Sequence, residues 1–280
     1  MLTRRGGYLR LREDAPVASA QLQREGYVVL AEVFDGDAVA ELRADIDRVF
    51  RDHAPDVRND RYEPVHWSAF RYEMLNRSEP CQRAVGERAI LDVVEPLLGE
   101  DCHVIANTAW RQPAGEPSTH GGQNWHLDAG PHVPRPPEVP WDERIPYPVF
   151  AVACHILLAD SDLDCGPTAV IPRSHTSGQA PPADRRADVE LTWQGTPALP
   201  LVGRAGDVLV FVSDIWHRRL PSAPDHPGRY FLQVHYGRRD LAQRLRPAGE
   251  LQQSPEAIAR ARTERDRTLI GLHAPFFYDG

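Results

Sequence analysis

The chain has 280 residues, of which 41% are hydrophobic and 26% charged, a composition typical of a globular protein. The formal net charge is −8 and all 32 basic side chains are arginine, so the chain lacks the basic excess of phosphate-binding proteins and we expect no nucleic-acid partner. Its 4 cysteines form no CxxC motif, and it has neither a signal-type apolar segment at the N-terminus nor an apolar run of about 18 residues. We therefore expect a cytoplasmic protein with reduced thiols and no membrane span.

The N-terminal segment is expected to alternate helix, strand and helix. Ser19 is suited to cap a short helix that ends at Gly26, and 27–30 has the apolar, β-branched composition of a strand. Asp35 is suited to cap the second helix. Apolar residues recur in that helix at three- and four-residue spacings, which predicts one buried stripe formed by Val39, Leu42, Ile46, Val49 and Phe50.

A third helix is predicted to begin at Ser78 and Pro80 and to end at Gly99. Residues 53–77, before it, are rich in proline, charged and aromatic residues and are expected to form a long loop or lid. The part of the chain from 1 to 100 is therefore predicted to be mostly helical.

Short segments rich in Val, Ile and aromatic residues dominate the next part of the chain, 101–240, and favour an antiparallel barrel or sandwich. The candidate strands are 103–110, 123–128, 149–158, 167–172, 189–193, 207–213 and 229–237. The segments 131–148 and 176–188 are too long for tight turns, and they are either functional loops or mobile surface loops. A last helix is expected from Ser254 within a C-terminal region of 241–280. We expect one domain over 1–280, although two would also fit the length.

One histidine of the 12 begins an HxD sequence, formed by His126, Leu127 and Asp128. If this segment is a strand, the two-residue period of strands places His126 and Asp128 on the same face, where an imidazole nitrogen and a carboxylate meet at one point. An HxD sequence also arises by chance, so the tripeptide fits an ordinary strand equally well.

His217 stands at the exit of the apolar strand predicted at 207–213. The intervening chain is long enough for several strands and a return to the same end of a barrel. Two histidines and one carboxylate on one face of a metal are the arrangement of non-haem iron(II) oxygenases. Zinc is the alternative metal, but the sequence shows no HExxH motif to supply the general base of a hydrolytic zinc site.

Arg229 opens the strand that follows His217. An oxygenase that uses 2-oxoglutarate needs a cation for the distal carboxylate, and the planar guanidinium donates two parallel hydrogen bonds to such a group without losing its charge. The alternative role for Arg229 is a surface salt bridge.

Four segments in the same order resemble motifs of the phytanoyl-CoA dioxygenase family of Fe(II)- and 2-oxoglutarate-dependent oxygenases. Residues 24–30 (Arg-Glu-Gly-Tyr-Val-Val-Leu) resemble its N-terminal opening, and 125–128 (Trp-His-Leu-Asp) its metal motif. Residues 165–175 (Cys-Gly-Pro-Thr-Ala-Val-Ile-Pro-Arg-Ser-His) and 206–217 (Gly-Asp-Val-Leu-Val-Phe-Val-Ser-Asp-Ile-Trp-His) resemble its later segments.

The resemblance implies a mainly β fold with flanking helices and a double-stranded β-helix core, that is, a jelly-roll or cupin-like barrel. It also implies that His126, Asp128 and His217 bind Fe(II) and that Arg229 anchors 2-oxoglutarate, with O₂ as the other cosubstrate. One departure stands out, because many members carry a small hydroxyl residue where this chain has Arg219, so the anchoring groups differ.

Several further residues are candidates for the site. His155 corresponds to a position beside 2-oxoglutarate in some relatives, but a buried strand histidine with a structural hydrogen bond is an equal alternative. His175 fits a loop-fixing role better than a ligand role. Residues that line the site or merely pack beside it are Asn107, Arg111, Trp125 and Trp216.

These observations predict a dioxygenase that oxidises, most simply hydroxylates, a C–H bond of a small organic molecule. The arginine-only composition and the 131–148 loop favour bacterial natural-product or antibiotic biosynthesis over the family's other roles. A cupin-like metal isomerase or hydrolase, and a catalytically silent binding module, are the two alternatives. The substrate, the type of oxidation and the oligomeric state stay open.

Overall fold

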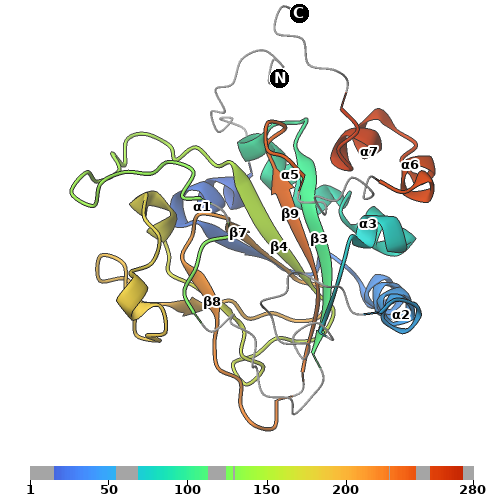
Figure 1. Ribbon diagram of the computed structural model, residues 1–280, viewed down its shortest axis with the longest axis horizontal. Coiled ribbons are helices and arrows are strands. Elements are labelled where there is room, and N and C mark those ends of the chain that lie inside the picture. The colour runs from blue at the N-terminus through green and yellow to red at the C-terminus, as the bar shows by residue number, and fades with distance from the viewer. Residues whose placement is uncertain are drawn as a thin grey trace, which may run out of the picture.

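A computed structural model describes residues 16–54, 69–112, 124–128, 130–226, 228–243 and 253–273. Two antiparallel sheets form its centre, and helices cover the outer face of the larger sheet (Figure 1). This arrangement confirms the predicted mainly β, jelly-roll type of core with flanking helices. Among the described residues, no helix is long and apolar enough to cross a membrane.

The larger sheet has six strands, each antiparallel to its neighbours. In order across the sheet they are β1 (Tyr27–Leu30), β7 (Val208–Val212), β4 (Ala151–Leu157), β9 (Arg229–Gly237), β3 (His103–Gln112) and β2 (Phe70–Tyr72). The smaller sheet has three strands in the order β6 (Leu199–Pro200), β5 (Thr168–Val170) and β8 (His217–Arg219).

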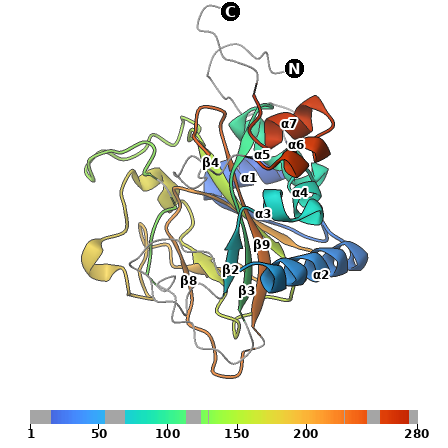
Figure 2. The ribbon, with the colours of Figure 1, turned by 45° about the vertical axis from the view of Figure 1, so that its right-hand side comes forward.

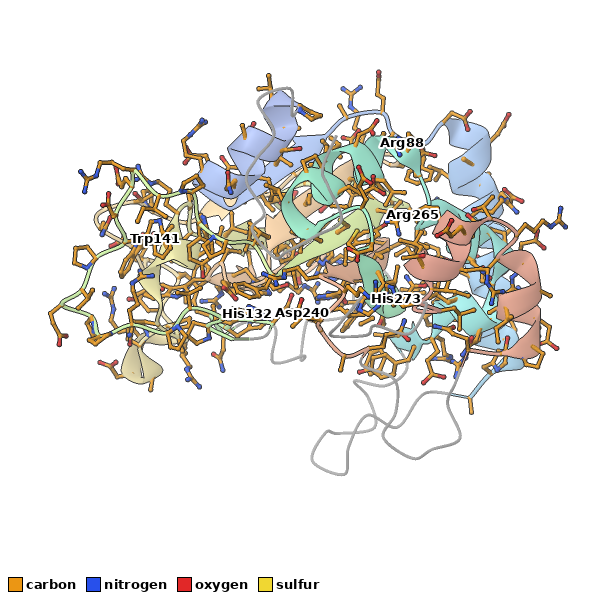
Figure 3. All side chains as sticks on the ribbon, turned by 90° about the horizontal axis from the view of Figure 1, so that it is seen from above. Arg88, His132, Trp141, Asp240, Arg265 and His273 are labelled. Atoms are coloured by element: carbon orange, nitrogen blue, oxygen red, sulfur yellow. The ribbon has the colours of Figure 1, made fainter. Side chains whose placement is uncertain are left out.

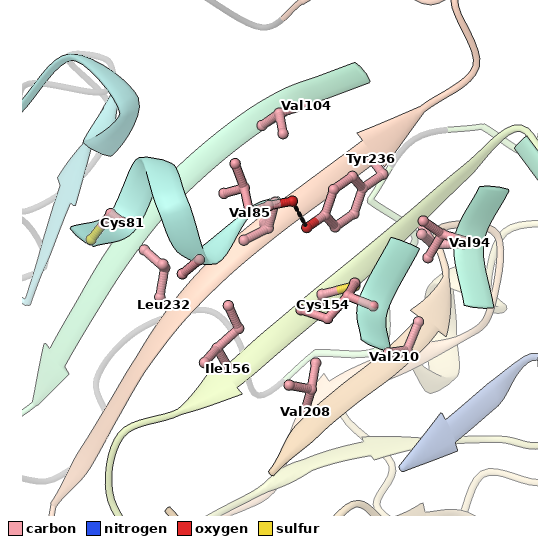
Figure 4. Close-up of a cluster of buried hydrophobic side chains, with 14 of the residues drawn as sticks. Cys81, Val85, Val94, Val104, Cys154, Ile156, Val208, Val210, Leu232 and Tyr236 are labelled. Carbon is pink, nitrogen blue, oxygen red and sulfur yellow. Dashed lines mark hydrogen bonds between the residues drawn. The ribbon is translucent and has the colours of Figure 1, made fainter. Parts of the chain in front are cut away.

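Helices pack on one face of the larger sheet (Figure 2). They are α1 (Val17–Glu25), α2 (Gly36–Asp52), α3 (Met74–Arg77), α4 (Glu79–Ala84), α5 (Arg88–Leu98), α6 (Pro255–Arg260) and α7 (Glu264–Leu269). The apolar stripe predicted for α2 is confirmed, since all five of its residues are buried. The Tyr236 hydroxyl donates a 2.8 Å hydrogen bond to the Val85 carbonyl across this helix–sheet interface (Figure 4).

Alternation along the strands separates the two faces of the larger sheet. On β4, Cys154 and Ile156 belong to the cluster beneath the helices, whereas Ala153 and Leu157 belong to a second cluster, which also contains Val170 of the smaller sheet. His155, which lies between Ala153 and Leu157 on this second face, therefore points into the interior between the two sheets.

The predicted helix at 19–26 ends at Gly26 as expected, but its cap is wrong. The helix begins at Val17, after Pro16, so Ser19 lies within its first turn. The Ser19 hydroxyl donates a 2.9 Å hydrogen bond to the Val93 carbonyl of α5 instead. The Ser19 side chain therefore makes a tertiary contact with α5 and does not cap its own helix. Asp35 caps α2 as predicted, accepting a hydrogen bond from the Ala38 amide.

The single helix predicted over 78–99 is divided into α4 and α5, with a turn at Val85 and Gly86. Its two ends, Ser78 and Gly99, are confirmed as caps. The expected loop at 53–77 contains β2 and α3, and its residues 55–68 lie outside the described part of the chain.

Two strand predictions fail in part. In 189–193 only one bridge forms, between Trp193 and Thr196, and within the described residues of 123–128 the strand reduces to one bridge between His126 and His217. Conversely, β6, β8 and α7 were not predicted. The predictions at 207–213 and 229–237 correspond to β7 and β9, and Ser254 caps α6 as predicted.

Candidate metal centre

Three side chains that could hold a metal ion meet at the edge of the smaller sheet. One ligand atom from each of His126, Asp128 and His217 lies within 4.8 Å of the other two. The His217 Nε2 is 3.4 Å from the Asp128 Oδ1, and the rings of His126 and His217 have centroids 4.2 Å apart. The structure therefore brings together the three residues that the sequence singled out.

Backbone pairing sets this arrangement. The amide of His126 donates to the His217 carbonyl at 3.0 Å, and the amide of His217 donates to the His126 carbonyl at 3.2 Å. The Asp128 amide donates to the Ser213 carbonyl at 3.3 Å. Segments far apart in the sequence are thus held side by side, and their side chains converge without a complete strand at 123–128.

Each of the two histidines makes a local hydrogen bond of the same kind, to the carbonyl two residues before it, which prepares it as a ligand. The Nδ1 of His126 lies 2.9 Å from the Asn124 carbonyl, and the Nδ1 of His217 lies 2.9 Å from the Ile215 carbonyl. A carbonyl oxygen only accepts, so the proton of each neutral ring is on Nδ1 and the lone pair is on Nε2. This is how metal-binding histidines are usually oriented by groups outside the ligand set.

The electrostatics of the three residues also suit a cation. Burial alone would raise the pKa of Asp128, but the imidazoles of His217, His235 and His126 hold it well below its ordinary value, so the carboxylate is ionised. Burial lowers the pKa of His217, while the adjacent carboxylate raises it, with a net upward shift. A fixed anion flanked by imidazoles is the donor set N, N, O of a borderline metal such as iron.

His235 of β9 belongs to this neighbourhood and was missed in the sequence. Its Nδ1 lies 3.7 Å from the Asp128 Oδ2. The signal that could have revealed it is the two-residue period of the strand 229–237, which puts Arg229, Phe231, Gln233 and His235 on one face.

The residues expected at the cosubstrate, His155, Arg219 and Arg229, lie around Thr168 of β5. The Thr168 hydroxyl is 3.5 Å from the His155 Nδ1 and accepts a 3.3 Å hydrogen bond from Arg229. Arg219 is paired with Thr168 across the β5–β8 ladder, and its guanidinium donates to the carbonyls of Gly166 and Cys165 and to the side chain of Gln112.

Two features of this group call for a small anionic or polar ligand. In the described part of the chain, no carboxylate lies within ion-pair distance of Arg229. Burial and the charge of Arg219 lower the pKa of Arg229 to about 9. The buried Nε2 of His155 has no hydrogen-bond partner among the described residues. Burial and the charge of Arg229 lower the pKa of His155 well below its ordinary value, so this ring is neutral at pH 7. A carboxylate ligand would pair with the cation, and a polar ligand would satisfy the imidazole.

The other candidates lie elsewhere. His175 joins its loop to α1, since its Nε2 is 3.0 Å from the Gln23 carbonyl. Arg111 pairs with Asp47 of α2 at 2.8 Å, and the Asn107 amide donates to the Gln233 carbonyl. Trp125 and Trp216 pack in a third hydrophobic cluster with Ala169, Ile171 and Leu191.

Comparison with known proteins gives a family match over most of the chain. The family model described as phytanoyl-CoA dioxygenase (PhyH) matches residues 22–221. Ectoine dioxygenase of Stutzerimonas stutzeri is 25% identical over 172 residues, which cover 58% of this chain and 52% of that enzyme. Ectoine dioxygenase of Sphingopyxis alaskensis is 24% identical over 232 residues, which cover 73% of this chain and 71% of that enzyme. The first alignment thus spans about half of the relative's length.

Solved structures share the fold at low sequence identity. EctD from S. alaskensis with bound Fe has a TM-score of 0.62 at 20% identity, covering 82% of this chain and 80% of that one. The epimerase SnoN in complex with Fe³⁺, alpha ketoglutarate and nogalamycin RO has a TM-score of 0.58 at 19% identity, covering 79% and 82%. The carbocyclase SnoK from nogalamycin biosynthesis has a TM-score of 0.57 at 16% identity, covering 84% and 88%.

Proposed function

The chain belongs to the phytanoyl-CoA dioxygenase family, and on that premise we propose that it is an iron(II)- and 2-oxoglutarate-dependent dioxygenase that oxidises a C–H bond of a small organic molecule. The observation that carries the proposal is the convergence of His126, Asp128 and His217, with ligand atoms within 4.8 Å of one another. The Nδ1 atoms of both histidines are engaged by carbonyls, so Nε2 is the nitrogen that each ring would offer to a metal.

Each residue has a defined part in the proposed reaction. Iron(II), when bound with 2-oxoglutarate and O₂, supplies the oxidising chemistry, which the side chains alone cannot provide. His126 and His217 contribute neutral nitrogen ligands, and Asp128 contributes one negative charge. Together the three residues would hold the metal and would leave room beside it for small-molecule ligands.

The Thr168 group is proposed to bind 2-oxoglutarate. Arg229 would hold the distal carboxylate with paired hydrogen bonds, and the Thr168 hydroxyl, which already bonds to Arg229, would fix the angle of the guanidinium. His155 is neutral at pH 7, and its free Nε2 would bond to the same ligand. Arg219, which pairs with Thr168, would keep its own guanidinium on the carbonyls of Gly166 and Cys165.

The substrate is proposed to be a natural-product intermediate, and hydroxylation is the simplest outcome. The structural neighbours include an epimerase and a carbocyclase of nogalamycin biosynthesis, so this fold also supports reactions other than hydroxylation. All four cysteines are free and buried, which fits the reducing cytoplasm that we propose as the compartment.

The experiment uses the purified protein without oxygen. Addition of Fe(II) and 2-oxoglutarate should produce a weak visible charge-transfer band, and admission of O₂ should yield succinate. Asp128→Ala and His217→Ala should abolish both signals while the circular dichroism spectrum is retained, because two remaining ligands bind iron poorly. His273→Ala, which removes a histidine that contacts His103 elsewhere, serves as the matched control.

The alternatives give different results. A cupin-like isomerase or hydrolase would bind metal but show neither the 2-oxoglutarate band nor succinate, and a silent module would form no succinate. Succinate formation at the wild-type rate in either ligand variant would remove that residue from the metal site.

A further inference from the structure

A buried carboxylate next to the proposed metal centre has no assigned role. Asp214 is 2% exposed and accepts three hydrogen bonds. The Nδ1 of His132 is 2.5 Å from its Oδ1, the backbone amide of His132 is 3.3 Å from its Oδ2, and the Tyr147 hydroxyl is 2.6 Å from its Oδ2. A buried carboxylate is costly without such donors, so these bonds hold the group in one orientation.

Asp214 and His132 lie on the segments that carry the metal ligands, and Tyr147 lies on the loop that joins on to the second of these segments. Asp214 lies in the turn between β7 and His217. His132 follows Asp128 by four positions and opens the 131–148 loop, which runs outward through Trp141 (Figure 3). Tyr147 lies at the other end of the same loop. One carboxylate therefore ties both ends of the loop to the segment of His217.

The two donor side chains are themselves held rigidly. The His132 ring stacks on Phe150 with centroids 5.1 Å apart and an interplanar angle of 4°. The Tyr147 ring meets the His175 ring edge-on, with centroids 5.1 Å apart. These ring contacts hold both donors in place beside Asp214, so the network links the Asp128 segment to the His217 segment at one spacing.

Close backbone approach supports the same spacing. A Cβ on Gly130 would lie 2.8 Å from the Asp214 Oδ1 and 2.5 Å from the His132 amide nitrogen. Gly130 also has φ +104°, a conformation that favours glycine. The chain after Asp128 thus passes directly against the carboxylate, and the Asp128 amide bonds to the carbonyl of Ser213, the residue before Asp214.

We propose that Asp214 is a positioning residue for the metal centre, which sets the distance between Asp128 and His217 through His132 and Tyr147. The inference rests on the proposed function, since it assumes that these two residues bind the metal. Hydrogen-bonding groups outside the ligand set commonly change metal affinity by about 10- to 100-fold.

The matched control is Asp207, a second buried carboxylate at the opposite end of β7. Its Oδ1 accepts a hydrogen bond from the Glu32 amide at 2.8 Å and its Oδ2 one from the Arg204 amide at 2.7 Å. Asp214→Asn and Asp207→Asn each replace a buried, hydrogen-bonded carboxylate by an amide at one end of β7. Of the two carboxylates, only Asp214 joins the segment of one metal ligand, His217, to the segment of another, Asp128.

The experiment measures binding of Co(II) and of Fe(II) by calorimetry, with thermal unfolding of the metal-free proteins alongside. Both variants should unfold at lower temperature. Asp214→Asn should also weaken metal binding by about 10- to 100-fold and shift the visible Co(II) spectrum, whereas Asp207→Asn should leave both unchanged. Tyr147→Phe, which removes a single hydroxyl, should weaken metal binding by a smaller factor.

The outcomes separate the two proposals. If the wild-type protein binds neither metal, the proposed function fails. If it binds metal and Asp214→Asn behaves as Asp207→Asn does, Asp214 only supports the fold and the positioning role is refuted. Should Asp214→Asn fail to fold, Tyr147→Phe is compared with Asp207→Asn in its place. An unchanged metal affinity and Co(II) spectrum in Tyr147→Phe would then refute the positioning role of Asp214.

Discussion

Replacement of Arg229 tests the proposed cosubstrate site most directly. The half-buried guanidinium donates a hydrogen bond to Thr168 and lies over the ring of Phe231, with its Cζ 4.9 Å from the ring centroid. Its pKa, lowered to about 9 by burial and by Arg219, still keeps it protonated at pH 7. A poorly solvated cation of this kind gains strongly from a carboxylate ligand. A charge-assisted, paired contact contributes about 2–3 kcal/mol.

The expected effect of Arg229→Ala is a loss of 2-oxoglutarate affinity of about 30- to 150-fold, which is that free energy expressed as a ratio of dissociation constants. Arg229→Lys keeps the charge but loses the paired geometry, so its affinity should lie between those of the wild type and the alanine variant. The assay is a titration of the anaerobic Fe(II) protein with 2-oxoglutarate, followed by the visible band.

The control for this titration is Arg111→Ala. Arg111 pairs with Asp47 at 2.8 Å on the side of α2. Its removal should leave 2-oxoglutarate binding unchanged. An Arg229→Ala variant that titrates like the wild type would refute the assignment, and Arg219 would become the candidate anchor.

Two further predictions concern stability. Burial lowers the pKa of His175 to about 4, so the unfolded chain binds a proton at this residue more readily than the folded chain does. The free energy of unfolding should therefore fall by about 3 kcal/mol as the pH drops from about 6.5 to about 4. In urea unfolding, His175→Gln should show a weaker dependence of this free energy on pH, and an unchanged pH dependence would contradict the prediction. Gly26→Ala should destabilise by roughly 1–3 kcal/mol, because Gly26 has φ +85° and the added Cβ would lie 2.6 Å from the His175 Nδ1. Gly36→Ala, whose Cβ meets nothing within 4 Å, should be close to neutral in the same thermal unfolding assay.

Elements with strong local signals were predictable from the sequence. The α2 stripe, the Asp35 cap and the apolar strands β7 and β9 follow from periodicity and capping, which are properties of a few neighbouring residues. The strand β8 was not predictable, because two arginines follow His217 in it. Arg218 is nevertheless buried, since it donates to the distant Ala187 carbonyl, and such a partner is invisible in the local sequence.

The metal candidates were found for a reason that was only partly correct. The sequence argument required a strand at 123–128, but the described residues there show only the bridge between His126 and His217. An extended backbone at a single paired residue is enough to orient His126, and the Asp128 amide adds a second attachment at Ser213. The role of the long 131–148 loop could not be read in advance, because its contacts with Asp214 join residues far apart in the chain.

Strand register joins the stability of this protein to its proposed chemistry. On β9, Tyr230, Leu232, Val234 and Tyr236 pack in the cluster beneath the helices, and the intervening residues Arg229, Gln233 and His235 face the other way. A slip of one residue would exchange the two sets, exposing the apolar side chains to the interior site and burying an arginine under the helices. The hydrophobic face that stabilises the sheet therefore also fixes where Arg229 and His235 lie. Substitutions on the helix side of β9 should then alter the site only when they disturb the pairing with β4 and β3, which hold the same register on both sides.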